Sequence, residues 1–253
     1  MPRSDRLRNE QTFHDRQALD RASTYALDPT ELVFSDPQYL DHESWIRPAF
    51  KRLGPQRGQT VLDYGSGHGM AAVVLARAGA LVTAVDLSCG YLNEARMRAQ
   101  ANDVRMECIS ANAEKLPLAD NTFDLVWGCA ILHHLNIEVA ASELNRVLRD
   151  GGRAVFCEPW GENGVLNWAR RYLPYPAKQR TIDERPLRAD DLRLLRKLFP
   201  KVETEGFQFL TMVGRLGVPD LLVTRLARLD AELLTRVPSL ARYCRYVIIT
   251  IQK

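Results

Sequence analysis

The chain has 253 residues, of which 46% are hydrophobic and 26% charged, and its formal net charge is +3 at pH 7. This composition is typical of a globular protein and excludes disordered, collagen-like and disulfide-rich chains. Five scattered cysteines without a C-x-x-C pair argue against a zinc site or a disulfide framework. No apolar run is long enough to span a membrane. We therefore expect a cytoplasmic protein with no bound metal and no membrane span.

The small net charge hides an uneven distribution. Residues 1–54 have a net charge of −1, residues 55–160 of −3, and residues 161–253 of +7. A basic C-terminal segment favours an anionic partner, which could be a small molecule, a membrane surface or RNA.

In chain order, residues 1–54 are predicted to form one or two helices, broken by Pro29, Pro37 and Pro48. Strands and helices then alternate. The predicted strands are residues 60–64, 81–86, 104–109, 123–129 and 153–157, and the predicted helices are residues 70–78, 91–101 and 139–148. This alternation predicts an α/β fold with a doubly wound, mostly parallel, Rossmann-like sheet and helices on both faces. Ligands of such sheets bind beyond the carboxyl ends of the strands.

The C-terminal part is less regular. We predict a loop at residues 159–190, a helix at 190–199, a strand at 202–210, an amphipathic helix at 219–235 and a final strand at 245–252. Arg225, Arg228 and Arg236 lie around the apolar face of the amphipathic helix. This helix is expected to pack on the sheet, to form a dimer interface or to rest on a membrane surface.

A glycine-rich loop follows the first strand of the alternating region, within the sequence Val61-Leu62-Asp63-Tyr64-Gly65-Ser66-Gly67-His68-Gly69. Its glycines let the chain bend sharply and let a ligand approach the backbone. The spacing matches neither G-x-G-x-x-G nor G-x-x-x-x-G-K-[ST]. Asp63 would repel a pyrophosphate and suits a ligand with a positive charge. Asp86, at the end of the second strand, can accept hydrogen bonds from both hydroxyls of a ribose.

A cationic ligand that contains a ribose has the profile of S-adenosylmethionine. Residues 60–159 resemble the class I S-adenosylmethionine-dependent methyltransferases, in particular the small-molecule group that includes ubiquinone, menaquinone and sterol methyltransferases. Five motifs carry the resemblance, at residues 61–69, 82–88, 110–117, 123–135 and 146–152. The resemblance implies a methyltransferase that forms S-adenosylhomocysteine. The sequence has no internal repeat, low-complexity tract or clear linker, so we expect a single domain. Within it we expect a helical lid (1–54), as in similar enzymes, a cofactor-binding core (55–160) and an acceptor-side region (161–253).

The same resemblance implies the cofactor-binding residues, which are Asp63, Gly65, Ser66, Gly67, Gly69, Asp86, Leu87, Asn112, Ala113 and Cys129. Leu87 is expected against the adenine face, Ala113 at the ring and Cys129 beside the methionine end. Asn112 stands where the family usually has an aspartate, and its side-chain carbonyl can still accept a hydrogen bond from the adenine amino group.

Methyl transfer from a sulfonium requires alignment and exclusion of water, and it requires a base only when the bound acceptor is protonated. The imidazoles of His133 and His134 suit proton removal. We prefer His133, because phosphoethanolamine methyltransferases, which residues 130–133 resemble, have a functional histidine in that place. The alternative is that both histidines only pack at the strand end. Glu158 is the third catalytic candidate. It either acts on the acceptor, by binding a cationic or hydroxylated group or by stabilising the positive charge that develops in a carbon methylation, or it only fixes its loop.

The acceptor site is expected to include Tyr25 and His14 of the lid and an aromatic and basic cluster after the core. The cluster consists of Trp160, Trp168, Arg170, Arg171, Tyr172, Tyr175, Lys178 and Arg180. Arginines suit a carboxylate or phosphate, and aromatic rings suit a ring or lipid chain. The alternative is a solvated charged loop.

The main hypothesis is therefore transfer of a methyl group to a small, anionic or lipid-linked metabolite. An RNA methyltransferase and a non-catalytic S-adenosylmethionine-binding protein are the alternatives, although we do not expect nucleic acid as the partner. A homodimer and peripheral contact with a membrane stay open.

Overall fold

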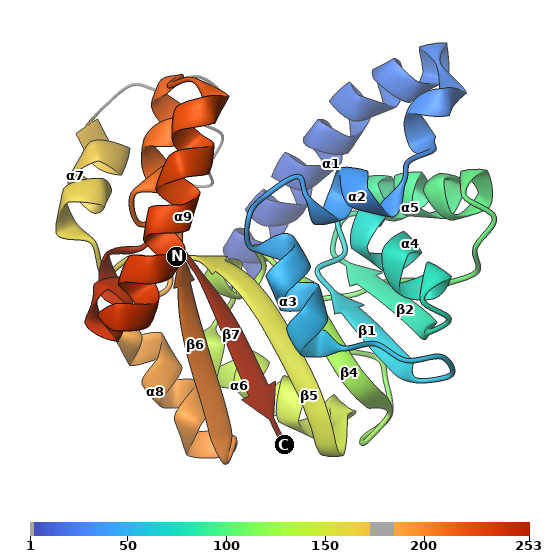
Figure 1. Cartoon of the computed structure of the whole chain (residues 1–253). Coiled ribbons are helices and arrows are strands. Elements are labelled where there is room, and N and C mark those ends of the chain that lie inside the picture. Colours follow the sequence, from blue (N-terminus) through green and yellow to red (C-terminus); the bar gives the residue numbers. More distant parts are fainter. Residues whose placement is uncertain (1–2, 173–184) are drawn as a thin grey trace.

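The computed structural model describes residues 3–172 and 185–253. Within these ranges, seven strands form one sheet in the order β3-β2-β1-β4-β5-β7-β6 (Figure 1). The strands are β1 (Thr60–Tyr64), β2 (Leu81–Asp86), β3 (Glu107–Ser110), β4 (Phe123–Cys129), β5 (Leu148–Pro159), β6 (Lys201–Phe207) and β7 (Tyr246–Gln252). The pairs from β3 to β5 are parallel, and β7 runs antiparallel to both of its neighbours. The predicted fold class, a mostly parallel Rossmann-like sheet, is confirmed.

The α-helices of the described residues are α1 (Arg3–Leu27), α2 (Asp36–Leu40), α3 (Ile46–Leu53), α4 (Met70–Arg77), α5 (Cys89–Ala101), α6 (Ile137–Val147), α7 (Gly164–Tyr172), α8 (Ala189–Leu198) and α9 (Asp220–Arg236). Four short 3₁₀ helices connect them, η1 (Pro29–Leu32), η2 (Leu132–His134), η3 (Thr211–Leu216) and η4 (Pro238–Tyr243).

Helices cover both faces of the sheet (Figure 1). Val61 of β1 belongs to a core shared with α3 and α4, whereas the next residue, Leu62, belongs to a core shared with α6 and α8. Neighbouring residues of a strand point to opposite faces, so a strand covered on both sides is apolar throughout. Both layers therefore follow from the continuous apolar runs in the sequence.

Two local predictions are wrong. Pro48 lies in the first turn of α3, where its missing N–H would have no partner inside the helix, so it does not break that helix.

The expected loop at residues 159–190 contains α7, which begins after a side-chain cap. Leu166 N donates to Asn163 Oδ1 at 3.0 Å, and Arg170 Nη1 reaches Trp160 O at 2.8 Å. These two contacts stabilise a helix that is too short to be evident from periodicity.

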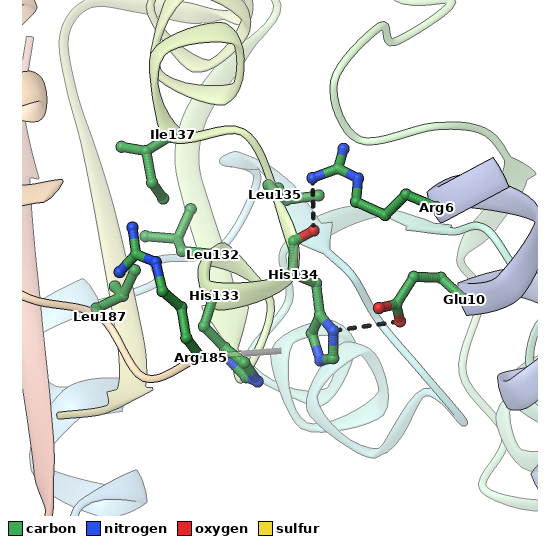
Figure 2. Close-up of a pocket in the computed structure, with 9 residues that line it drawn as sticks. All are labelled: Arg6, Glu10, Leu132, His133, His134, Leu135, Ile137, Arg185 and Leu187. Atoms are coloured by element: carbon green, nitrogen blue, oxygen red, sulfur yellow. Dashed lines mark hydrogen bonds and ion pairs between the residues drawn. The ribbon is translucent and has the colours of Figure 1, made fainter. Parts of the chain in front are cut away.

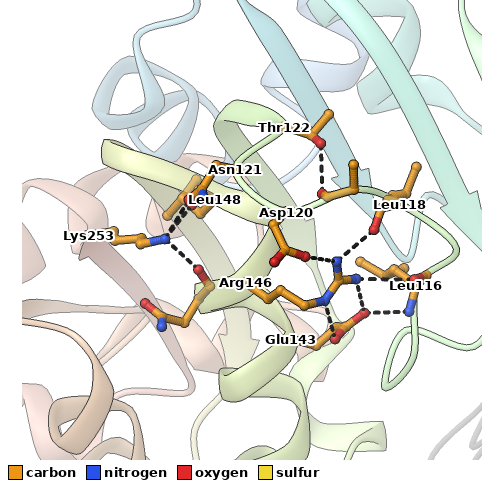
Figure 3. A network of polar contacts seen from close by, with 11 residues as sticks. Leu116, Leu118, Asp120, Asn121, Thr122, Glu143, Arg146, Leu148 and Lys253 are labelled. Atoms are coloured by element: carbon orange, nitrogen blue, oxygen red, sulfur yellow. Dashed lines mark hydrogen bonds and ion pairs between the residues drawn. The ribbon is translucent and has the colours of Figure 1, made fainter.

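The connection between β3 and β4 is fixed by Arg146 of α6 (Figure 3). Its guanidinium donates to Glu143 Oε1 at 2.6 Å, to Asp120 Oδ1 at 2.7 Å and to Leu118 O at 2.7 Å. Leu116 N in turn donates to Glu143 Oε1 at 2.6 Å. This network holds the connection that also carries the predicted adenine-side residues.

Helix α1 is attached to the rest of the fold largely by polar contacts with α5. Arg21 donates to both carboxylate oxygens of Glu94, at 2.7 and 3.0 Å. Asp15 accepts a hydrogen bond of 2.5 Å from Ser88 Oγ at the beginning of α5. Few apolar side chains of α1 are buried, Ala18 among them.

Helix α9 does not lie on the sheet as one prediction had it; its contacts are made chiefly with η3 and η4 (Figure 1). Among the described residues, no helix combines the length and the hydropathy that crossing a membrane requires.

Candidate functional site

A cavity of about 180 Å³ opens at the carboxyl ends of β1, β2 and β4, beneath α1. It is lined by Leu7, Glu10, His14, Gly65, Gly67, Val85, Asp86, Leu87, Tyr91, Ala111, Asn112, Ala113, Cys129, Ala130, Ile131, His134 and Leu135. Seven predicted cofactor residues are among them, namely Gly65, Gly67, Asp86, Leu87, Asn112, Ala113 and Cys129. The cavity therefore lies where the topology of the sheet predicts a ligand.

The glycine loop forms one wall of the cavity. Gly65 N and Ser66 N both donate to Val85 O at 2.9 Å, which turns the chain away from β1. Gly65 has a φ of +74°, and a Cβ at this position would lie 2.6 Å from the side chain of Ile131. A larger residue would push Ile131 out of place, so glycine is required here.

Asp86 is held in a fixed orientation by the backbone. Its Oδ2 accepts from Gly67 N at 2.8 Å and its Oδ1 accepts from Ser88 N at 2.9 Å. Burial raises the pKa of Asp86, while these backbone N–H groups and His14 oppose that change. Each oxygen of a carboxylate has a second lone pair, so both can still accept a hydroxyl of a ligand.

Three predicted cofactor residues, Asp63, Ser66 and Gly69, do not line the cavity. Asp63 is buried and accepts a hydrogen bond from the backbone of Ala72 in the first turn of α4. Burial and the charge of Asp86 raise the pKa of Asp63 to about 8. Gly69 begins α4 with a φ of +80°, and a Cβ there would lie 2.6 Å from Ala95. The Ser66 hydroxyl is buried, and no hydrogen bond from it to a described residue is formed. Seven of the ten predicted residues therefore line the cavity, and these three belong to its supporting wall.

The residues predicted to contact adenine also line the cavity. Asn112 Oδ1 accepts from Glu114 N at 2.9 Å, which orients the amide and leaves a second lone pair on the oxygen. Ala113 is fixed by the hydroxyl of Tyr64, which donates to Ala113 O at 2.5 Å. Leu87 lies on the same cavity wall.

A second, smaller cavity of about 80 Å³ adjoins the first (Figure 2). It is lined by Arg6, Glu10, Leu132, His133, His134, Leu135, Ile137, Arg185 and Leu187. Glu10, His134 and Leu135 line both cavities. A molecule in the second cavity would thus lie beside a molecule in the first.

Glu158 orients the histidine of this second cavity. His133 Nδ1 lies 2.7 Å from Glu158 Oε2. Glu158 Oε1 accepts from Ile131 N at 2.9 Å and from Leu132 N at 2.8 Å. The Glu158 side chain has no exposed surface and lines neither cavity, and its contacts are those expected of a loop-fixing carboxylate. It fixes the loop after β4 and the orientation of His133.

The other predicted acceptor residues are not brought to these cavities. Tyr25, Trp160, Arg170 and Arg171 are absent from both linings, and Trp160 is buried among the core residues. Arg170 fixes the backbone of Trp160, and Arg171 is exposed on α7. Tyr175, Lys178 and Arg180 lie outside the described residues.

Sequence reasoning missed two arginines that enter the second cavity, Arg6 from α1 and Arg185 from the chain before α8 (Figure 2). Arg6 donates to His134 O at 3.1 Å and pairs with Glu114. Arg185 pairs with both carboxylate oxygens of Asp191 at 2.8 Å. No local pattern marks them. His14, predicted only as a lid residue that touches ligand, does line the first cavity.

A family model described as "Methyltransferase domain" matches residues 62–156. The demethylmenaquinone methyltransferase of Tropheryma whipplei (strain Twist) is 35% identical over 174 residues, which cover 67% of this chain and 69% of that protein. The malonyl-[acyl-carrier protein] O-methyltransferase of Pseudescherichia vulneris is 39% identical over 106 residues, covering 42% and 41% of the two chains.

Among solved structures, the fold is similar to that of geranyl diphosphate C-methyltransferase from Streptomyces coelicolor A3(2), in complex with Mg²⁺, geranyl diphosphate and S-adenosyl-L-homocysteine. The TM-score is 0.55 at 19% identity, over 81% of this chain and 77% of that chain.

Proposed function

Because the chain belongs to the class I S-adenosylmethionine-dependent methyltransferases, we propose that this enzyme methylates a small, anionic or lipid-linked acceptor. The observation that carries the proposal is the pair of adjoining cavities, one lined by the glycine loop and Asp86, the other by His133. The first would hold the cofactor and the second the acceptor. The free thiols of all five cysteines support a reducing compartment such as the cytoplasm.

The residues of the first cavity fit the cofactor part by part. The oriented Asp86 carboxylate suits the ribose hydroxyls, Leu87 and Asn112 suit adenine, and the backbone at Gly65 leaves room for the methionine end. When bound, S-adenosylmethionine supplies an electrophilic methyl group on a sulfonium. The protein then has to align the acceptor with that methyl group and keep water out.

His133 is the residue that we propose as the base. A neutral imidazole that donates Nδ1–H to the Glu158 carboxylate has its lone pair on Nε2. For a hydroxyl or amine acceptor, the acceptor would gain the methyl group and Nε2 would take its proton. Arg6 and Arg185, which line the same cavity, would hold an anionic group of the acceptor.

Transfer of a radiolabelled methyl group tests this proposal. The acceptors to try are demethylmenaquinone, malonyl-[acyl-carrier protein] and geranyl diphosphate, the compounds after which the relatives above are named. With an accepted compound that loses a proton on methylation, His133→Gln is expected to lower kcat about 100-fold or more, with unchanged cofactor affinity. The exposed His42 provides the control variant His42→Gln. Equal turnover of His133→Gln and the native enzyme would contradict the role of His133. Labelling of none of the three compounds would contradict the proposed acceptor class.

Cofactor binding is expected to depend on pH through Asp63. The carboxyl has a pKa of about 8 in the free protein and is therefore largely neutral at pH 7. A positively charged ligand nearby favours the ionised form, so binding should release a proton and strengthen as the pH rises from about 6 to about 8. Calorimetric titrations in that range should show this rise in the native enzyme and lose it in Asp63→Asn. An identical pH dependence in both proteins would contradict the assignment.

Contact with a membrane surface is a further part of the proposal, since a lipid-linked acceptor would be found there. Helix α9 exposes Leu221, Leu222 and Leu229, with the exposed Arg225 and Arg228 beside them. Apolar side chains flanked by arginines suit an anionic lipid surface. We expect the enzyme to float with phosphatidylglycerol vesicles at low salt and Leu222→Glu to float much less. An enzyme that stays in the soluble fraction would contradict this, and sedimentation would then test the alternative, a homodimer.

A further inference from the structure

Three side chains with metal-binding chemistry meet where α1 crosses the loop after β4. Glu10 and His14 come from α1, one turn apart, and His134 comes from η2. One ligand atom from each of them lies within 4.8 Å of the other two. Figure 2 shows the side chains of Glu10 and His134 next to each other, joined by a polar contact.

The distances match those between ligands of one metal ion. His14 Nε2 lies 3.4 Å from Glu10 Oε2, and His134 Nδ1 lies 3.2 Å from the same oxygen. Tetrahedral zinc with bonds of about 2.0 to 2.1 Å places its ligand atoms about 3.3 to 3.4 Å apart. Direct hydrogen bonds between charged partners are shorter, at about 2.7 to 2.9 Å. Both distances to Glu10 Oε2 therefore fit a coordination shell, and the two imidazole nitrogens lie within 4.8 Å of each other.

The histidines are also oriented as metal ligands are. His14 Nδ1 lies 3.1 Å from Gln17 Oε1, and this contact directs Nε2 toward Glu10. A hydrogen bond from the second ring nitrogen commonly fixes a metal-bound histidine in this way. His134 is held through its backbone, since Arg6 donates to His134 O. His134 Nδ1 is buried and forms no hydrogen bond with the described part of the chain.

The charges around the cluster permit a cation. Asp86 faces His14, and the nearby guanidinium of Arg6 is neutralised by Glu114. Two imidazoles and one carboxylate form a ligand set that suits zinc and related transition metals better than Mg²⁺. All three side chains line the first cavity, so a fourth coordination position would point into it.

We propose that Glu10 Oε2, His14 Nε2 and His134 Nδ1 bind one divalent transition-metal ion, with Zn²⁺ as the ion that fits best. The ion joins α1 to the loop after β4 and leaves one position for water or a ligand oxygen. This revises the expectation, drawn from the absence of C-x-x-C pairs, that the protein holds no metal. It also gives the largely polar attachment of α1 a strong link to the core.

Cobalt binding to the full chain tests the site without any need for the methyl acceptor. The protein is stripped with a chelator, and Co²⁺ is added while its visible absorption is recorded. We expect one equivalent to bind with the strong bands of a four- or five-coordinate ion, and one equivalent of Zn²⁺ to displace it. Glu10→Gln, His14→Gln and His134→Gln should each weaken binding about 100-fold or more. His42→Gln, which changes an exposed histidine elsewhere, should bind like the native chain.

Thermal unfolding provides a second readout. Zn²⁺ should raise the Tm of the native chain and of His42→Gln, but not that of His14→Gln. Retention of native cobalt binding by both Glu10→Gln and His14→Gln would overturn the proposal, as would the absence of binding at about 100 μM Co²⁺. Titration of S-adenosylhomocysteine in the presence of chelator is a separate measurement, so failure of the metal site can be distinguished from failure of the proposed function.

Discussion

Replacement of Asp86 by alanine is expected to weaken the binding of S-adenosylmethionine about 100-fold or more. The two carboxylate oxygens are already oriented by Gly67 N and Ser88 N, and Asp86 lines the cavity where a ribose would lie. A hydrogen bond to a charged group contributes about 1.5 to 3 kcal/mol, so the loss of two such bonds costs about 3 kcal/mol or more. That free energy corresponds to at least about a hundredfold change in Kd.

The matched control is Glu107→Ala, which removes an exposed carboxylate from the neighbouring strand β3. Calorimetry with both variants, after circular dichroism has shown that both are folded, compares the two carboxylates directly. Asp86→Asn adds a finer comparison, because it keeps the side-chain shape and one acceptor oxygen. Native affinity in Asp86→Ala would mean that the ribose lies elsewhere.

Replacement of Glu158 separates its effect on stability from its effect on chemistry. Glu158→Ala removes the acceptor of Ile131 N and Leu132 N and the partner of His133, all in a buried region. Each unsatisfied buried group costs about 1 to 3 kcal/mol. We expect a loss of about 3 to 5 kcal/mol in the free energy of unfolding, measured by urea denaturation.

Glu158→Gln is expected to behave differently. The amide oxygen can still accept from the two loop N–H groups, so its NH₂ group must face His133 Nδ1. His133 then has to accept at Nδ1, which moves the ring proton to Nε2 and removes the base. The variant should unfold close to the native midpoint and bind S-adenosylhomocysteine normally, yet turn over about 100-fold or more slowly with a hydroxyl acceptor. Native turnover in Glu158→Gln would show that Glu158 only stabilises the loop.

The cofactor half of the site could be predicted from the sequence because its signals are local. The alternation of strands and helices places the ends of β1 and β2 at one edge of the sheet, and Gly65 and Asp86 occupy those ends. Asp63 and Gly69 belong to the same motif but face the core. This could not be predicted, because the pattern does not say toward which side of the loop a residue points.

The second cavity could not be predicted, because its residues are distant in the sequence. Arg6 and Arg185 meet only through the packing of α1 and of the chain before α8. The two interpretations of Glu158 could not be separated either, since the choice depends on the path of the loop after β4. In the folded protein this loop brings Ile131 N, Leu132 N and His133 Nδ1 within hydrogen-bond distance of the Glu158 carboxylate.

The central claim is that the cavity at the glycine loop binds S-adenosylmethionine. Calorimetric titration of the native chain with S-adenosylmethionine and with S-adenosylhomocysteine tests it most directly. The account predicts one binding site per chain and Kd values of about 1 to 10 μM, which correspond to a binding free energy of about −7 to −8 kcal/mol. The absence of binding by both compounds at about 1 mM, in a chain that circular dichroism shows to be folded, would contradict it.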